Sequence, residues 1–401
     1  MMKILILANK PPYPTKDGSS LATLNMAIGL AKQNINVTIL AISTQKHSST
    51  IKQIPKELKE LISFHLIEVD TRISIFKAIK NLLFSNLPYN IERFINQNYL
   101  NKLTELIKIN EYDIIQLEGL YLLPYARTIK TLTDRPIVYR SHNLEHEIWQ
   151  RISINEKNWF KAKYFGILSK RLLKLEIEVT SSVSGIVNIS IREKDWFNSL
   201  KEIKPSIYIP VGFEIPNSTE SNTNETIKLC FIGSLDWIPN QEGLKWFIDN
   251  VWQLAKSKKP SLELHIAGRN SSKSFNDYLK ANRGIFFHGE VPESKQFLSN
   301  YKIMIVPLLS GSGMRVKIVE AMFMRLAIIT TSIGCEGIDA VNENNVVIAD
   351  KPEDFLKAIE VLTQSTELIE SISNNAFTFA NENFNVTKLT EKLIGFYKSI
   401  I

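Results

Sequence analysis

Short apolar runs alternate with helix-like segments twice along this chain of 401 residues, and this alternation restricts the possible folds more than any other feature. The first half holds six runs with the length and composition of buried strands, at 3–9, 36–42, 64–69, 112–119, 136–143 and 184–190. The second half holds six more, at 228–234, 262–268, 284–290, 302–309, 327–332 and 345–350. Strands separated by helices in this way form parallel sheets with helices on both faces. The sequence therefore predicts an α/β fold with two doubly wound parallel sheets.

Two of the intervening segments have a helical period that also predicts which side chains are buried. After the first strand we expect a helix that packs through Leu21, Leu24, Ile28 and Ala31. After 228–234 we expect a helix that packs through Leu244, Phe247, Ile248, Val251 and either Leu254 or Ala255.

The alternation is interrupted where Pro, Asn, Ser and Thr dominate, which is typical of a connection between domains. The length of the chain also favours two domains of about 200 residues each. We therefore expect an N-terminal domain at 1–208, a linker at 209–226 and a C-terminal domain at 227–380. We expect the remaining residues, 381–401, to form a helix that packs back toward the N-terminal domain.

The composition is that of an ordinary globular protein, with 44% hydrophobic and 22% charged residues, so neither disorder nor a fibrous repeat is indicated. The apolar run before Asn9 is too short for a signal peptide, and the sequence contains no uninterrupted apolar stretch of membrane-spanning length. The two cysteines, Cys230 and Cys335, argue against a disulfide framework. These features predict a cytoplasmic protein.

The positive charge belongs to the first half of the chain. Residues 1–210 contain 29 Lys and Arg against 19 Asp and Glu, a net charge of +10, whereas the rest of the chain carries −3. The lysines are scattered and are not interleaved with aromatic residues, so nucleic acid is not the expected partner. The charge is compatible with peripheral contact with an anionic membrane and a lipid-diphosphate acceptor, and equally with a solubilising surface.

The stretch GSGMRVKIVEAM, residues 311–322, follows a predicted strand and begins a predicted helix. Gly311 and Gly313 would let a ligand approach the backbone, and the start of the helix offers unpaired N–H groups to an anion. Arg315 and Lys317 have charges suited to a diphosphate, and Glu320 could accept both hydroxyls of a ribose. The alternative is a plain glycine turn in which Lys317 and Glu320 form an i,i+3 surface pair.

Two other motifs point to different chemistry. The dinucleotide-binding fingerprint is only half matched, because the third glycine is missing and the following strand, 327–332, ends in Ser332. His142 and His146 fit the H-x-x-E-H zinc-peptidase pattern, which requires both histidines one turn apart on a helix. Since His142 directly follows a predicted strand, we expect this geometry to fail and His142 to bind substrate instead.

Five segments together carry a family resemblance that covers nearly the whole chain. They are PPYPTKDGSSLATLNMAIGLAKQNINVTIL, SHNLE, IPVGFE, FIGSLDWIPNQEGLKWF and PLLSGSGMRVKIVEAMFMRLAIITTSIGCEGI. With the two-domain plan, they resemble the retaining GT-B glycosyltransferases of family 4. The last segment is the most specific, because it combines a strand, a glycine loop, a helix with Glu320, another strand and a GCEG turn.

The resemblance implies two Rossmann-like domains that face a central cleft, with the nucleotide-sugar donor held mainly by the C-terminal domain and the acceptor by the N-terminal domain. It implies a metal-independent hexosyltransferase that retains the anomeric configuration, needs no cofactor, and takes a glycan or lipid-linked acceptor in polysaccharide biosynthesis. An enzyme of this kind would be cytoplasmic and could bind peripherally to the inner face of the membrane.

The resemblance also assigns roles to individual residues. In the N-terminal domain, Gly18 matches the glycine of the first loop, which approaches the reacting centre, and His142 matches the histidine that contacts the transferred sugar. Glu320 matches the second glutamate of the E-x7-E motif, which binds ribose. The other donor-binding positions are Gly311, Ser312, Gly313, Gly233, Gly268 and Gly289, with Asn240 lining the first loop of the second domain.

The sequence departs from the family at two places. Ser312 stands where the first glutamate of E-x7-E would be, so the usual carboxylate to the sugar hydroxyls is missing. The usual Arg and Lys pair is also missing from GSLDWIPNQEG, where the first cation is Lys245. We infer that Arg315 and Lys317 supply the charge for the diphosphate instead.

Two further function classes stay open on the sequence alone. A GT-B nucleotide-sugar epimerase would interconvert free nucleotide sugars without an acceptor, although the arrangement at 311–322 favours transfer. A zinc-dependent hydrolase would use His142 and His146.

Overall fold

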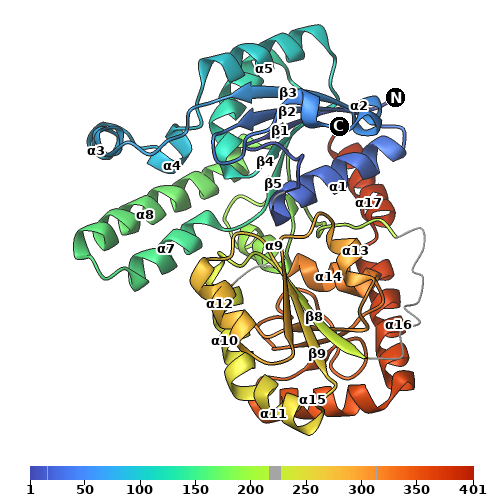
Figure 1. Ribbon diagram of the computed structural model, residues 1–401. Coiled ribbons are helices and arrows are strands. Elements are labelled where there is room, and N and C mark those ends of the chain that lie inside the picture. The colour runs from blue at the N-terminus through green and yellow to red at the C-terminus, as the bar shows by residue number, and fades with distance from the viewer. Residues whose placement is uncertain (16, 216–226, 312–313) are drawn as a thin grey trace. The chain divides into compact units, whose positions relative to one another are not determined.

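The protein is described by a computed structural model that covers residues 1–15, 17–215, 227–311 and 314–401. The chain divides into two compact units (Figure 1). Unit 1 consists of Met1–Gly212 together with Val386–Ile401, and unit 2 consists of Phe213–Asn385.

The described strands of unit 1 form a seven-stranded parallel sheet in the order β3-β2-β1-β4-β5-β6-β7. Its strands are β1 (Lys3–Ala8), β2 (Asn36–Ser43), β3 (Ile62–Glu68), β4 (Ile114–Glu118), β5 (Ile137–Ser141), β6 (Gly185–Asn188) and β7 (Ser206–Tyr208). The first six coincide with the predicted runs. The sequence analysis missed β7, a three-residue edge strand whose side chains are only partly buried.

The helices of unit 1 cover both faces of this sheet. They are α1 (Gly18–Lys32), α2 (Lys56–Leu61), α3 (Ile75–Phe84), α4 (Tyr89–Glu92), α5 (Gln97–Ile109), α6 (Ala126–Leu132), α7 (Glu145–Asn155), α8 (Trp159–Ser182), α9 (Ile191–Asn198) and α17 (Val386–Ile400), with 3-10 turns at Ile51–Gln53 and Leu120–Tyr125. Successive β1 side chains point to opposite faces, as in any strand. Leu5 and Leu7 pack in the core that includes α5 and α8, whereas Ile4 and Ile6 pack in the core that includes α1 and α17.

Unit 2 repeats the same plan. Its sheet has the order β10-β9-β8-β11-β12-β13, and every pairing is parallel. The strands are β8 (Lys228–Ile232), β9 (Glu263–Ala267), β10 (Ile285–Gly289), β11 (Ile303–Val306), β12 (Ala327–Thr330) and β13 (Val347–Ile348). The helices are α10 (Ile238–Phe247), a π-helical turn (Ile248–Trp252), α11 (Gln253–Lys258), α12 (Lys273–Ala281), α13 (Ser294–Leu298), α14 (Val316–Phe323), α15 (Pro352–Gln364) and α16 (Thr366–Asn383). All six predicted strands are present.

The two predicted helix faces have different outcomes. In unit 2 the stripe Leu244, Phe247, Ile248 and Val251 is buried, and it continues through Ala255, since Leu254 is 54% exposed. In α1 only Leu24 of the four predicted residues is fully buried. Ala22, Met26, Ala27 and Leu30 are also buried, because α1 packs on the sheet and on α17 as well.

The segment after β7 is packed as far as Phe213. Ile209, Val211 and Phe213 are buried, and the Phe213 N–H donates to the Phe384 carbonyl at 2.8 Å. The rest of the predicted linker, 216–226, lies outside the described residues. None of the helices in the described part of the chain combines the length and apolarity that a membrane crossing requires.

Candidate functional site

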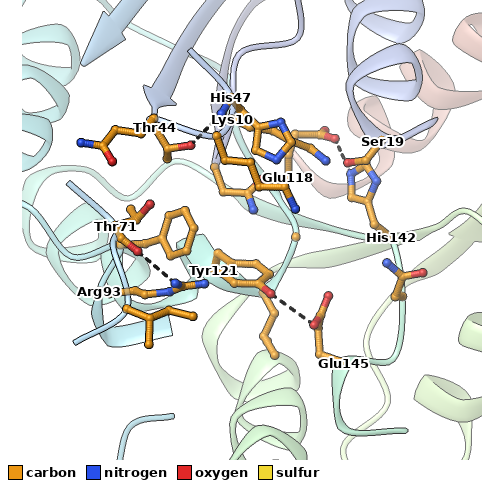
Figure 2. A pocket seen from close by; sticks show the side chains of 18 of the residues that line it. Lys10, Ser19, Thr44, His47, Thr71, Arg93, Glu118, Tyr121, His142 and Glu145 are labelled. Carbon is orange, nitrogen blue, oxygen red and sulfur yellow. Dashed lines mark hydrogen bonds and ion pairs between the residues drawn. The ribbon is translucent and has the colours of Figure 1, made fainter. Parts of the chain in front are cut away.

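Unit 1 contains a pocket of about 490 Å³ at the carboxyl ends of its central strands (Figure 2). Lys10 follows β1, Thr44 follows β2, Glu118 ends β4, and His142 follows β5. Neighbouring strands β1 and β4 are where the strand order of the sheet reverses. Open α/β sheets bind ligands at this topological switch point, so the pocket lies where the fold predicts a site.

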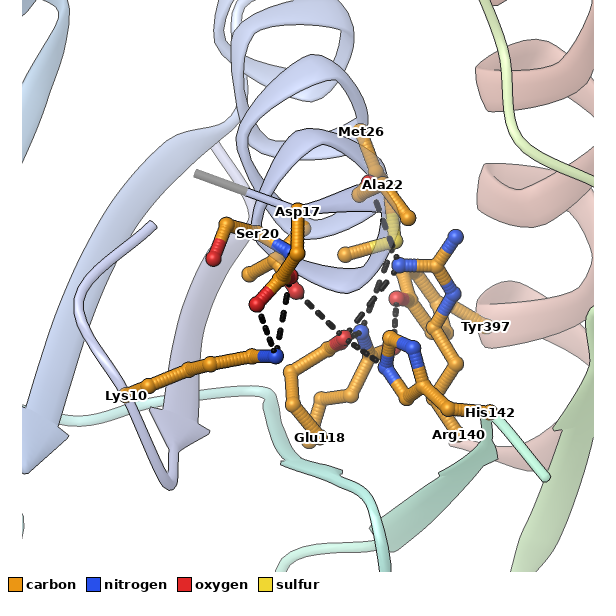
Figure 3. Close-up of polar contacts among 11 residues, drawn as sticks. Lys10, Asp17, Ser20, Ala22, Met26, Glu118, Arg140, His142 and Tyr397 are labelled. Carbon is orange, nitrogen blue, oxygen red and sulfur yellow. Dashed lines mark hydrogen bonds and ion pairs between the residues drawn. The ribbon is translucent and has the colours of Figure 1, made fainter. Parts of the chain in front are cut away.

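Glu118 is the centre of a buried polar cluster beside this pocket (Figure 3). Its Oε2 accepts hydrogen bonds from Thr23 Oγ1 at 2.9 Å and from Arg140 Nη1 at 3.2 Å, and lies 2.7 Å from His142 Nε2. Arg140 also donates to the Ala22 carbonyl at 3.2 Å. The Glu118 carboxylate therefore links α1 to the carboxyl ends of β4 and β5 through hydrogen bonds.

The charge state of Glu118 determines the tautomer of His142. Burial alone would raise the pKa of Glu118, but Arg140 and His142 outweigh it and lower that pKa to about 2. Burial lowers the pKa of His142 despite the attraction of Glu118. The ring is thus neutral at pH 7, and its Nε2 carries the proton that it donates to the ionised carboxylate. His142 Nδ1 is then an acceptor, and it has no hydrogen-bond partner among the described residues.

Glu145 is a second carboxyl group on the wall of the pocket (Figure 2). It begins α7, and its Oε2 accepts a hydrogen bond from Tyr121 Oη at 3.3 Å. Burial and the neighbouring Glu176 raise the pKa of Glu145 to about 7. A carboxyl group that titrates near neutrality can exchange a proton with a substrate hydroxyl.

The structure separates the two histidines of the H-x-x-E-H pattern. His142 follows β5 and contacts Glu118, whereas His146 lies in α7 and contacts Glu176 through Nδ1. Each histidine therefore has a different carboxylate partner, and the two do not share a helix face. The arrangement does not support the zinc-hydrolase alternative.

In unit 2, Lys317 lies in the first turn of α14 and reaches the first turn of α10 and the strand β8. Its Nζ donates to Asn240 Oδ1 at 2.8 Å and lies 4.3 Å from the centre of the Phe231 ring. Burial and the nearby Arg315 lower the pKa of Lys317 to about 7. The ammonium group is thus desolvated and close to another cation, so an anion bound there would stabilise its charged form.

Arg315 is 5% exposed and precedes α14. Its guanidinium lies 5.6 Å from the centre of the Trp237 ring, and burial lowers its pKa. Gly311 adopts φ +118°, a conformation that favours glycine. A Cβ at position 311 would lie 2.9 Å from Arg315 Nη2, so the glycine also makes room for the guanidinium.

Glu320 lies one turn further along α14 and points to a different neighbour. Its Oε1 accepts a hydrogen bond from Ser294 Oγ at 2.5 Å, and burial raises its pKa. Since Lys317 contacts Asn240 and Glu320 contacts Ser294, the structure does not support the alternative of an i,i+3 surface pair.

Three of the glycines expected to bind the donor lie next to one another in space. Gly233 follows β8, Gly268 follows β9 and Gly289 ends β10. The Gly268 N–H donates to the Gly289 carbonyl at 2.8 Å, and a Cβ on Gly268 would lie 2.2 Å from the Gly233 carbonyl oxygen. No larger residue fits at position 268 without a change in the backbone.

Gly18 is the first residue of α1, next to Ser19, which lines the unit 1 pocket. Ser312 and Gly313 lie outside the described residues. The structure thus places His142 and the start of α1 around one pocket, and Gly233, Asn240 and Lys317 in one cluster of unit 2.

Sequence reasoning missed several polar residues at these sites. Lys10 pairs with Asp17, which caps α1, at 2.7 Å, and Arg140 pairs with Glu118 (Figure 3). Arg269 Nε donates to Ser234 Oγ at 3.1 Å. Their positions in the sequence could have indicated them. Lys10 and Arg269 come directly after a predicted strand, and Arg140 is a charged residue inside one.

Comparison with known proteins gives a family for part of the chain. Residues 226–365 match the family described as "Glycosyl transferases group 1". Over 399 residues the chain is 23% identical to a protein of Klebsiella pneumoniae described as an uncharacterized 44.6 kDa protein in the cps region, and the alignment covers 97% of this chain and 98% of that protein.

Solved glycosyltransferase structures share the fold at low sequence identity. Anabaena HepE in complex with UDP-glucose is 14% identical, with a TM-score of 0.66 and 100% of both chains covered. Sucrose-phosphate synthase of Thermosynechococcus elongatus is 12% identical, with a TM-score of 0.70 over 100% of this chain and 99% of that one. TarM, an S. aureus protein, is 13% identical, with a TM-score of 0.68 over 99% of both chains. The chain thus has the GT-B fold of these proteins, with two parallel α/β sheets, and its residues 226–365 match the glycosyl transferases group 1 family.

Proposed function

We propose that this glycosyltransferase moves a hexosyl group from a nucleoside-diphosphate sugar to a glycan or lipid-linked acceptor, with retention of the anomeric configuration. The observation that carries the proposal is a pair of cationic side chains in unit 2. Arg315 caps α14, and Lys317 lies in the first turn of the same helix. Both groups have a pKa lowered by burial, so a bound diphosphate would stabilise their charged forms.

The cations suit the charge that develops during the reaction. As the glycosidic bond to phosphate breaks, negative charge accumulates on the leaving nucleoside diphosphate, and positive groups fixed in advance stabilise it. Arg315 and Lys317 supply this charge from the protein itself, so we propose that transfer needs neither a metal ion nor a cofactor. Gly311 and, outside the described residues, Ser312 and Gly313 would contact the donor sugar, while Glu320 would bind the ribose.

The unit 1 pocket is proposed to hold the acceptor and the reacting end of the donor sugar. His142 lines the pocket, and we propose that its unprotonated Nδ1, which is buried without a hydrogen-bond partner among the described residues, accepts a hydrogen bond from a sugar hydroxyl. Gly18 begins α1, the helix that Glu118 links to His142 through hydrogen bonds. The pocket walls also carry Lys10, Arg93 and Glu145, which are polar groups suited to a hydroxyl-rich ligand.

Two observations support a polysaccharide role. The Klebsiella relative is described as encoded in the cps region, and HepE was solved with UDP-glucose, a nucleotide sugar. We therefore propose that this chain also uses a nucleotide-sugar donor and a lipid-linked or glycan acceptor. The net charge of +10 in residues 1–210 fits peripheral binding to the anionic cytoplasmic face of a membrane.

The experiment is a thermal-shift panel of nucleoside-diphosphate sugars, followed by donor turnover and NMR of the product's anomeric configuration. With the donor that gives the largest shift, Arg315→Ala should weaken binding by about tenfold or more, since a charge-assisted hydrogen bond contributes about 1.5–3 kcal/mol. Arg283→Ala is the matched control, because Arg283 is an exposed arginine of unit 2 at the amino end of β10. Wild-type donor affinity in Arg315→Ala would disprove the diphosphate role, and release of an epimerised nucleotide sugar without acceptor would disprove transfer.

A further inference from the structure

The helix α3 of unit 1 exposes an apolar face. Ile75, Ile79 and Leu83 recur every four residues, so they lie along one side of the helix. Phe76 and Phe84 are 87% and 81% exposed, and Ile75, Ile79 and Leu83 are exposed too. An apolar patch that is continuous along a helix marks an interaction site, unlike scattered single residues.

The apolar side chains of α3 contribute little to holding it on unit 1. Its one fully buried residue is Asn81, which donates to the Leu87 carbonyl at 2.9 Å. Arg171 of α8 donates to Asn81 Oδ1 at 3.0 Å and to the Leu82 carbonyl at 2.9 Å. A helix of this length is marginal in water unless an apolar face is packed, yet here polar contacts fix the position of α3 and leave that face to solvent.

The start of α8 extends the same surface. Trp159 and Phe160 are stacked with ring centres 3.8 Å apart and are 62% and 67% exposed. Between α3 and α7–α8 lies a groove of about 540 Å³, lined mainly by apolar and aromatic side chains. Ala78 and Leu82 form its α3 side, and Trp149 of α7 and Phe165 of α8 form the opposite side. We call the exposed side chains of α3 together with Trp159, Phe160 and this groove the α3–α8 surface.

Lysines flank the α3–α8 surface. On α3 they are Lys77 and Lys80, just before α8 there is Lys157, and in its first turns there are Lys161 and Lys163, all of them exposed. Glu156 is the one carboxylate that lines the groove. A helix with aromatic and aliphatic residues on one face and lysines beside it has the pattern of a helix that lies in a membrane interface. Interfaces between proteins are depleted of lysine, which argues against a second copy of this chain.

We propose that the α3–α8 surface docks on an anionic lipid bilayer and that the groove takes a lipid hydrocarbon chain from it. Phe76, Phe84 and Trp159 insert between the headgroups, and the lysines contact lipid phosphates. Tryptophan and phenylalanine prefer this depth of a bilayer, and each lysine near an anionic surface strengthens binding.

The groove adjoins the pocket where the acceptor is proposed to bind. Ile73 and Arg93 line both cavities. A lipid with its chain in the groove would therefore place its polar head beside Arg93, which donates to the Thr71 carbonyl at 2.9 Å, at the edge of the polar pocket (Figure 2). This step rests on the proposed function and specifies the acceptor as lipid-linked, whereas bilayer docking itself does not depend on glycosyl transfer.

The first experiment measures co-sedimentation of the full chain with vesicles of equal parts phosphatidylglycerol and phosphatidylcholine, without donor. Phe76→Ser/Phe84→Ser should lower the partition coefficient by about tenfold or more, and Lys77→Gln/Lys80→Gln by about fivefold per lysine. These residues are exposed, so the variants should fold normally. The matched controls are Ile109→Ser/Ile203→Ser and Lys108→Gln/Lys201→Gln, which alter exposed residues of unit 1 outside the surface.

The second experiment locates the inserted side chains. Vesicles with acyl chains brominated near the headgroup should quench tryptophan fluorescence of the wild type, and Trp159→Phe should lose a large part of that quenching. Equal vesicle binding by the α3 variants and their controls would overturn the proposal. So would a wild-type dimer in analytical ultracentrifugation that Phe76→Ser/Phe84→Ser converts to a monomer. Vesicle binding with no donor turnover would contradict the proposed function alone.

Discussion

At the scale of single residues, the buried charges of unit 1 depend on one another. Arg140 and Glu118 are 1% and 3% exposed, and each is the other's main counter-charge in the cluster. Removing one member of a buried pair leaves the other desolvated without compensation, which costs far more than losing a surface pair. Glu118 also fixes the tautomer of His142, so the same contact affects stability and the proposed site.

Glu118→Gln should lower the free energy of unfolding by about 3 kcal/mol or more at neutral pH, because Arg140 keeps its charge in a buried position. The pKa of Glu118 falls from its ordinary value of 4.5 to about 2 in the folded protein, so its stabilisation is complete above about pH 5. The difference between wild type and variant should shrink as pH falls from about 4.5 toward 2. Urea unfolding across this range measures it, with Glu111→Gln, an exposed acid of unit 1, as the control. A constant difference down to pH 2 would contradict the assignment.

Lys317 should give the proposed donor binding a pH dependence. Its pKa is about 7 without ligand, and a bound diphosphate would raise it, so binding above pH 7 requires uptake of a proton. The affinity for a nucleotide sugar should therefore fall as pH rises above about 7, approaching about tenfold per pH unit. Calorimetric titrations in buffers of different ionisation enthalpy measure the proton uptake.

Lys317→Met should bind donor weakly at every pH and lose this dependence. Lys280→Met changes an exposed lysine of α12 and should keep it. Proton uptake that is unchanged in Lys317→Met would show that another group titrates.

At the scale of elements, α17 completes unit 1 from the far end of the sequence. Leu393, Phe396 and Tyr397 pack in the core that contains Ile4 and Ile6 of β1. The contact with α1 is close, since a Cβ on Gly29 would lie 2.7 Å from Thr390 Cγ2. This second layer explains why α1 is buried beyond the face that its own sequence predicts.

Leu393→Ala should destabilise unit 1 by about 2–5 kcal/mol, as large-to-small changes in a packed core do. Its effect should appear as faster hydrogen exchange in α1 and β1, far away in sequence, while the core strands of unit 2 keep their protection. Lys398→Ala, an exposed position on the same helix, is the control. Faster exchange that is confined to α17 would show that this helix does not support the core of unit 1.

At the scale of the whole molecule, local composition predicted the sheets well. Six of the seven described strands of unit 1 and all six of unit 2 overlap the predicted runs, because buried parallel strands are continuous apolar segments. The exception, β7, is short and only partly buried, so it has no such run. The ends of the same strands also predicted where His142, Gly233 and Gly268 would lie, since parallel strands bring their carboxyl ends to one edge.

The sequence by itself thus determined the α/β class, the strand runs and the sheet edges that carry the sites, because these depend on short-range patterns. Tertiary structure alone decided that Lys317 contacts Asn240 while Glu320 contacts Ser294, and that Thr23, Glu118 and Arg140 meet. It also decided which core the C-terminal helix joins, where Leu393 and Tyr397 pack with Ile4 of β1, and that α3 is held by Asn81 with its apolar face exposed. Such contacts join residues up to hundreds of positions apart, and the local sequence records what each side chain can bind but not which partner folding brings to it.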